Sequence, residues 1–140
     1  MAAASSSPSA TEPQTEVANL RAVFAAIAAA TVARYAELVG SSMAVLLRLD
    51  LNEVAQANAW GIRFDVSGLA DPHPFETIAA AARAYQILAR TLINHMSTVI
   101  GARLAYSIVR DAVQQLEPAQ RQWVIGYHLV PDAMLSGPGQ

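Results

Sequence analysis

The chain has 140 residues, which is enough for one domain with a hydrophobic core. Its formal net charge is −2 and its charges are spread singly, so nothing in the composition attracts nucleic acid. Cysteine is absent, which excludes disulfides, thiol catalysis and cysteine-ligated metals.

The first thirteen residues are mostly small or polar and include two prolines, which predicts a disordered segment over 1–13. A first helix is expected to begin at Gln14 or Thr15, with Thr15 available as its N-cap. Its apolar residues recur at spacings typical of one helix face: Val17, Leu20, Phe24, Ile27, Thr31 and Leu38. Alanines between them favour the helix and permit the close approach of a neighbouring backbone.

The run Gly40-Ser41-Ser42 predicts a break between two helices. Gly40 suits the left-handed residue that follows a helix, and Ser41 or Ser42 can cap the next one. The second helix is expected over 42–57, with Ala44, Leu47, Leu51 and Val54 on one face. The alternative is one continuous helix over 14–57, because a glycine inside a helix costs only about 1 kcal/mol.

Residues 58–74 are the least regular part of the chain. Ile62, Phe64 and Val66 alternate with Arg63 and Asp65, which suits a short β-strand. The sequence offers no evident partner strand. We therefore expect an extended crossover packed on the helices, or pairing with the same segment of a second subunit.

The second half of the chain repeats the helical pattern. A third helix is expected after Pro74 as far as Ile100, with a stripe formed by Ile78, Ala81, Tyr85, Leu88, Leu92, His95 and Val99. Gly101 repeats the break, and a fourth helix is expected over 102–117 before Pro118 stops it. A short helix or turn over 118–125 and an extended tail over 126–140 complete the prediction.

Residues 13–50 can be aligned with residues 74–111 at a constant offset of 61. Phe24 then falls on Tyr85, Leu38-Val39-Gly40 on Val99-Ile100-Gly101, and Asp50 on Asp111. A fixed period indicates one supersecondary unit used twice. We predict an all-α domain over 14–125, a four-helix bundle-like assembly of two αα-hairpins (14–57 and 75–117) joined by the crossover 58–74.

Charged residues make up only 14% of the chain, against roughly 25% in an ordinary soluble domain. This shortage predicts buried subunit interfaces and an oligomer, most simply a dimer. The apolar stretch 22–33 is too short to cross a bilayer, which takes roughly 20 residues. The first residues also lack the basic start and apolar core of a signal peptide. We expect a cytoplasmic protein without a transmembrane span.

His95 lies on the apolar stripe of the third helix, and the repeat places Arg34 at the equivalent position. Polar groups on both inner faces could form a ligand site or set the register of the helices. Glu37, Asp50 and Asp111 are the available anionic partners. In the alternative interpretation, Tyr35 and Met96 turn inward while Arg34 and His95 stay at the edge.

Trp60 and Trp123 flank the helical hairpins, and they either line an aromatic pocket or cover the ends of the core. The three histidines are far apart, and His95 has no carboxylate three or four residues away, so no metal site is predicted. The glycines are isolated rather than clustered, and no nucleotide cofactor is predicted. The second and fourth helices carry too few basic groups for a DNA-recognition helix.

The sequence therefore favours a non-enzymatic helical module for protein–protein interaction, acting as a scaffold or regulatory subunit. The helix–helix interface is expected to be formed by Leu20, Phe24, Ile27, Tyr85, Leu88 and Leu92. Replacing Phe24 or Leu88 by Glu should dissociate or unfold the protein. The alternative function is a small-molecule sensor or carrier with an apolar, aromatic-lined pocket beside Trp60, His95 and Trp123.

Overall fold

The computed structural model describes residues 8–65, 68–70 and 73–131. Five helices and two short strands follow one another in these residues, in the order α2 (Pro8–Val39), α3 (Ser41–Ala57), β1 (Arg63–Asp65), β2 (Gly68–Ala70), α4 (Ile78–Ile100), α5 (Ala102–Gln114) and α6 (Pro118–Gly126). The predicted all-α class is confirmed at this level, because strand is confined to one small hairpin.

The helix boundaries agree with the sequence-based prediction except at some ends. α2 begins at Pro8 rather than at Gln14, so part of the segment expected to be disordered is helical. Pro8 fits the first helical position because the N–H group that proline lacks has no partner there. Residues 1–7 and 132–140 lie outside the described residues. α6 confirms the short helix expected over 118–125.

Gly40 and Gly101 break the helices, as predicted, but through a different conformation. Their φ/ψ values are 99°/158° and 87°/154°, an extended region that is essentially restricted to glycine, not the left-handed helical region expected. The capping prediction for Ser41 and Ser42 is wrong, because Ser41 is already helical and Gly40 itself occupies the N-cap position without a side-chain bond.

The strand prediction is right for β1, but the expectation that it has no partner in the chain is wrong. β1 pairs antiparallel with β2, and Phe64 lies opposite Leu69. The side chain of Asn52 on α3 also holds β1: its Nδ2 donates to the Phe64 carbonyl at 3.0 Å, and its Oδ1 accepts from the Phe64 N–H at 2.7 Å. Glycine and alanine in β2 have weak strand propensity, which hid the partner. Val66, also expected in the strand, lies outside the described residues.

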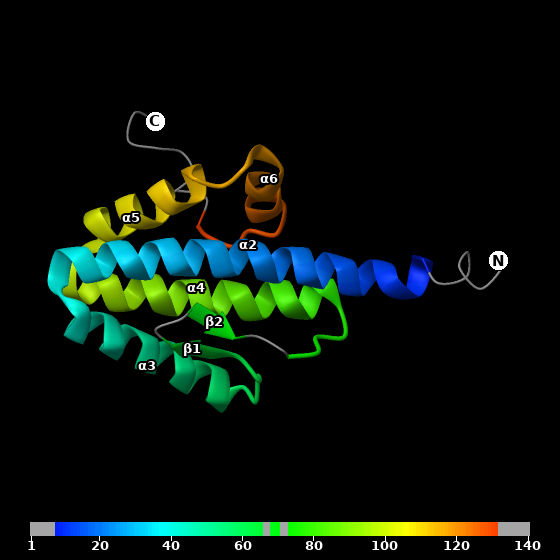
Figure 1. The fold of residues 1–140 in the computed structure, drawn as a ribbon, viewed down its shortest axis with the longest axis horizontal. Coiled ribbons are helices and arrows are strands. Elements are labelled where there is room, and N and C mark those ends of the chain that lie inside the picture. Colours follow the sequence, from blue (N-terminus) through cyan, green and yellow to red (C-terminus); the bar gives the residue numbers. More distant parts are fainter. Residues whose placement is uncertain (1–7, 66–67, 71–72, 132–140) are drawn as a thin grey trace.

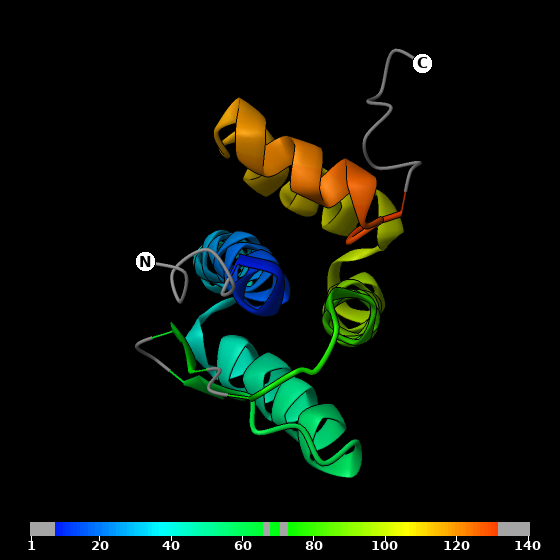
Figure 2. The same cartoon turned by 90° about the vertical axis from the view of Figure 1, so that its right-hand side faces the viewer.

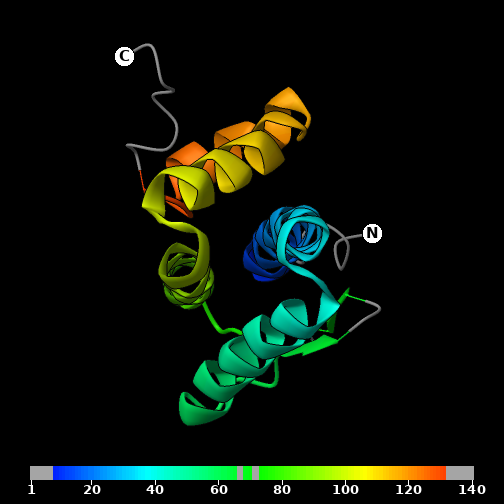
Figure 3. The same cartoon turned by 90° about the vertical axis from the view of Figure 1, so that its left-hand side faces the viewer.

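The helices form a middle layer with a cover on each side. α2 and α4 run side by side and in the same direction through the middle (Figure 1). Viewed along these helices, α3 and the hairpin lie on one side of the pair, and α5 and α6 on the other (Figures 2 and 3). α3 and α5 each contact both α2 and α4. Both middle helices therefore bury two faces.

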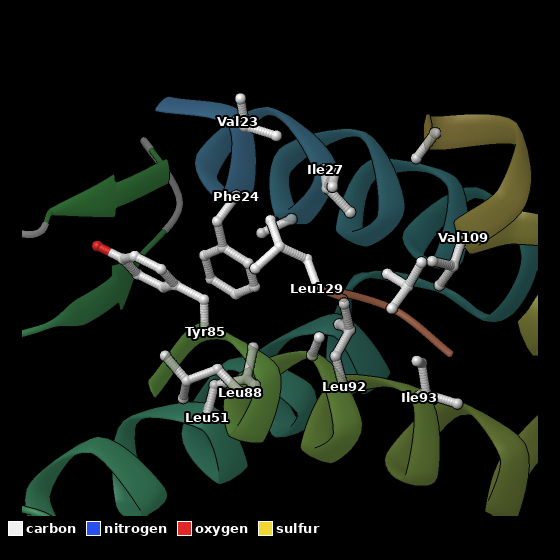
Figure 4. Close-up of a cluster of buried hydrophobic side chains, with 14 of the residues drawn as sticks. Val23, Phe24, Ile27, Leu51, Tyr85, Leu88, Leu92, Ile93, Val109 and Leu129 are labelled. Atoms are coloured by element: carbon white, nitrogen blue, oxygen red, sulfur yellow. The ribbon is translucent and has the colours of Figure 1, made fainter. Parts of the chain in front are cut away.

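The core forms where α2 faces α4 (Figure 4). Phe24 of α2 stacks on Tyr85 of α4 with ring centroids 4.9 Å apart and an interplanar angle of 24°. The six residues predicted to form the helix–helix interface are at most 1% exposed: Leu20, Phe24, Ile27, Tyr85, Leu88 and Leu92. The contact that they make lies within one chain, so an interface between two copies must use other residues.

One segment of α2, Thr15–Val39, is long and apolar enough to cross a membrane by length and composition. In this structure 33% of its most apolar window is buried. The core helix of a soluble protein meets the same criteria, and α2 contacts α3, α4 and α5. The finding therefore adds no argument for a membrane.

Candidate functional site

A polar pair links α3 and α4 near the end of the core. His95 Nδ1 lies 2.6 Å from Asp50 Oδ2, and the His95 side chain is only 12% exposed. A carboxylate can only accept, so Nδ1 carries the hydrogen of this bond. Of the three carboxylates considered from the sequence, Asp50 is therefore the partner of His95.

The phenol of Tyr35 lies against this pair. Its ring meets the His95 ring edge to face, with centroids 5.8 Å apart. Thr31 precedes Tyr35 by one helical turn, so both project from the same face of α2. The Thr31 and Tyr35 hydroxyls and His95 Nε2 are buried without a hydrogen-bond partner among the described residues. Burial raises the pKa of the Tyr35 hydroxyl above its usual value of 10.0.

Arg34 does not join the polar cluster that Thr31, Tyr35, Asp50 and His95 form. Its side chain is 58% exposed and donates to Glu37 Oε1 at 3.0 Å, within the same helix. Tyr35 and Met96 are fully buried, so the interpretation in which these two residues turn inward is confirmed. That interpretation is right for Arg34, which stays at the edge, and wrong for His95, which is largely buried.

A groove of about 640 Å³ lies between the end of α3 and the start of α4. We call it the Trp60 groove, and it is lined by Asn58, Trp60, His73, Pro74, Phe75, Glu76, Thr77, Ala80, Arg83, Ala84 and Ile87. The Phe75 ring packs against its neighbours, with centroids 4.5 Å from His73, 5.7 Å from Tyr85 and 6.5 Å from Trp60. Of these four rings, Trp60, His73 and Phe75 line the groove and form its aromatic wall.

The structure does not bring the predicted pocket residues together. Trp123 of α6 stacks on Tyr127 at 5.5 Å and lines a different hollow with Glu16 and Gln122. His95 lines neither this hollow nor the Trp60 groove. Sequence reasoning missed His73, Phe75 and Arg83 as neighbours of Trp60. Their signal was the cluster of aromatic residues in the irregular segment before α4.

Six of the exposed large apolar residues belong to the helices that meet at the α2–α3 and α4–α5 junctions. These two junctions lie at the same end of the molecule (Figure 1). We call these six residues the apolar patch. Its members are between 41% and 56% exposed: Leu38, Val45, Leu46, Leu49, Val99 and Leu104. Three of them form the outer face of α3, where Val45 and Leu49 are one turn apart. Two exposed carboxylates border these residues, because Asp50 lies one turn after Leu46 and Glu53 lies one turn after Leu49.

Among the described residues, no group of three or more histidine, aspartate or glutamate side chains is placed to hold a metal ion. Comparison of the chain with protein-family models, with curated proteins and with solved structures finds no match. The function of the chain is therefore inferred from the geometry of the Trp60 groove and of the apolar patch.

Proposed function

We propose that this chain is a non-enzymatic helical module that associates with a second copy of itself through the apolar patch, as a scaffold or regulatory subunit. The observation that carries the proposal is the exposure of Leu46 and Leu49, at 49% and 56%, on the outer face of α3. Soluble monomers rarely expose large contiguous apolar patches, and those that they expose are commonly interaction sites.

A second copy is the occupant that best fits the chemistry of the patch. The patch residues carry no charge, and the net charge of the chain is only −2. Burying these six residues against a second copy therefore desolvates no charged group of their own. A two-fold dimer also covers the same surface on both subunits at once. The shortage of charged residues in the sequence is consistent with such a buried face.

The experiment compares two substitutions with the same chemistry and nearly the same exposure. Leu46 on the patch is 49% exposed, and Ile125 on α6, outside the patch, is 47% exposed. Sedimentation velocity over a range of concentrations should show a dimer for the unmodified chain and for Ile125→Glu. Leu46→Glu should sediment as a folded monomer, because a dimer would bury its charge without a partner. A monomeric unmodified chain, or equal effects of the two substitutions, would overturn the proposal.

We also propose that the bundle-like arrangement of helices arose as two copies of one αα-hairpin related by an approximate two-fold axis. The offset of 61 relates α2 to α4 and α3 to α5. The contact of α3 with α4 therefore has its equivalent in the contact of α5 with α2. Positions separated by the offset of 61 share their burial: Leu20 and Ala81, Ile27 and Leu88, Tyr35 and Met96, Leu47 and Ile108, Leu51 and Ala112. Phe24 and Tyr85, which are also equivalent, stack on one another. Residues close to a two-fold axis are expected to meet their own equivalents.

A further inference from the structure

We infer that the Trp60 groove binds a small planar aromatic molecule that carries a carboxylate. This inference is independent of the proposed self-association, because no residue of the apolar patch lines the groove. The groove volume of about 640 Å³ is within the range of small-molecule sites. Six of its eleven lining residues are apolar or aromatic and five are polar or charged, so it offers contacts to both an apolar body and a polar group.

The floor and one wall favour a flat, apolar ligand body. Ala80, Ala84 and Ile87 lie along one side of the first turns of α4 and present small or aliphatic groups. Trp60 and Phe75 also line the groove and provide its aromatic wall. A planar aromatic molecule can stack on such a wall and contact the alanine floor at the same time.

Backbone contacts hold this wall in place before any ligand arrives. Ala59, two residues after the end of α3, has a left-handed φ of 58°. The Ala59 N–H donates to the Gln56 carbonyl at 3.0 Å, and the Trp60 N–H donates to the Ala55 carbonyl at 2.9 Å. Two bonds of this kind define a tight helix end. They orient Trp60 toward the start of α4, although alanine is unfavourable in this conformation.

Two hydrogen bonds hold His73, on the other side of the aromatic wall. The Gly61 N–H donates to His73 Nδ1 at 2.9 Å, and Arg21 donates to the His73 carbonyl at 2.8 Å. His73 then supports Phe75 through an edge-to-face contact. A wall that is already ordered loses little conformational entropy on binding, which increases the affinity for a ligand that fits.

The charge of the ligand follows from Arg83. This residue lines the groove, is exposed, and forms no ion pair with any described residue. A planar guanidinium binds carboxylates through two parallel hydrogen bonds. Thr77 and Ala80, at the start of α4, also line the groove, so the positive end of the α4 dipole borders it. Glu76 also lines the groove, and its negative charge opposes the binding of a carboxylate. Glu76 directly precedes the N-cap of α4, so the positive end of the helix dipole partly offsets its charge.

The experiment uses Trp60 as its own reporter. In a Trp123→Phe background the chain has one tryptophan, so its emission reports on the groove alone. Titration with 2-naphthoate should quench this emission in a saturable way. Arg83→Gln should weaken the binding roughly tenfold or more, since a hydrogen bond to a charged group is lost. Arg90→Gln, on the same exposed side of α4 but outside the groove, should leave the affinity unchanged.

A further variant and a second probe test the charge of the ligand. Glu76→Gln should tighten the binding of 2-naphthoate, because it removes the opposing charge. 2-Naphthylmethylammonium should bind more weakly than 2-naphthoate. Tighter binding of this cation, an effect of Arg90→Gln equal to that of Arg83→Gln, or quenching that never saturates would each overturn the inference. Circular dichroism of every variant confirms that the exposed substitutions leave the helices intact.

Discussion

Replacing Gly40 or Gly101 by Ala tests the reason why each long helix ends where it does. Both glycines have a positive φ, 99° and 87°, combined with an extended ψ. A Cβ built on either residue would meet no atom within 4 Å. Any loss of stability must therefore come from the backbone conformation and not from a steric clash with a neighbour.

The magnitude follows from two opposing effects. Holding a non-glycine residue in a sparsely populated backbone region costs about 1–3 kcal/mol. Alanine also restricts the unfolded chain, which offsets about 0.4–1 kcal/mol of this loss. Each substitution should therefore lower the free energy of unfolding by about 1–2 kcal/mol.

The chain cannot avoid this strain by joining the two helices into one. A continuous helix through Gly40 would carry α3 away from α2 and α4, and would expose Leu47 and Leu51, which are now fully buried. Exposing two leucines costs about 3–6 kcal/mol, which exceeds the backbone strain. The Ala variants should therefore keep the native arrangement and bear the strain.

Urea unfolding followed by circular dichroism measures the effect, and Gly126→Ala is the matched control. Gly126 also has open space around its Cβ position, but its φ is not positive and it lies in α6. Alanine there should be neutral or slightly stabilising. The reasoning fails if Gly40→Ala is as stable as the unmodified chain. The proposed equivalence of the two hairpins fails if Gly40→Ala and Gly101→Ala differ by more than about 1 kcal/mol.

Two further predictions concern the core. Tyr35→Phe should raise the free energy of unfolding by about 1 kcal/mol in urea unfolding at pH 7, because it removes a buried hydroxyl that has no partner. Burial also raises the pKa of this hydroxyl in the folded state, so the unfolded chain ionises first, and the free energy of unfolding of the unmodified chain falls as the pH rises from about 10 toward the raised value. Between pH 9 and 12, the free energy of unfolding should fall less for Tyr35→Phe than for the unmodified chain. An identical pH dependence of the two proteins would contradict this account. Leu88→Ala should cost about 2–5 kcal/mol, because Leu88 is fully buried, whereas Ile125→Ala, exposed on α6 and outside the apolar patch, should cost less than about 1 kcal/mol. Leu88→Glu should unfold the chain rather than release folded monomers, and a folded monomer in sedimentation would show that Leu88 contacts a second copy.

The tertiary arrangement explains where site prediction from the sequence stopped. His95 and Asp50 were both identified as candidates, but the sequence left three carboxylates open as partners. The choice depends on α3 crossing over α4, and no local pattern encodes that crossing. Because Trp60 and Trp123 both flank the hairpins in sequence, the sequence predicts that they either line one pocket or cover the ends of the core. They separate in space because α3 and α6 lie on opposite sides of the middle helices (Figure 2).

The spacing of apolar residues and the two glycines by themselves determined the helices and their breaks, because helix periodicity and backbone freedom are local properties. The same spacing identified the inward faces of the two middle helices, with Leu20, Phe24 and Ile27 on α2 and Tyr85, Leu88 and Leu92 on α4. Only the tertiary structure decided that these stripes face each other within one chain, and that Leu46 and Leu49 remain outside. It also paired β1 with β2, whose residues carry little strand preference. These outcomes depend on which surfaces meet, and that follows from the packing of segments far apart in the sequence.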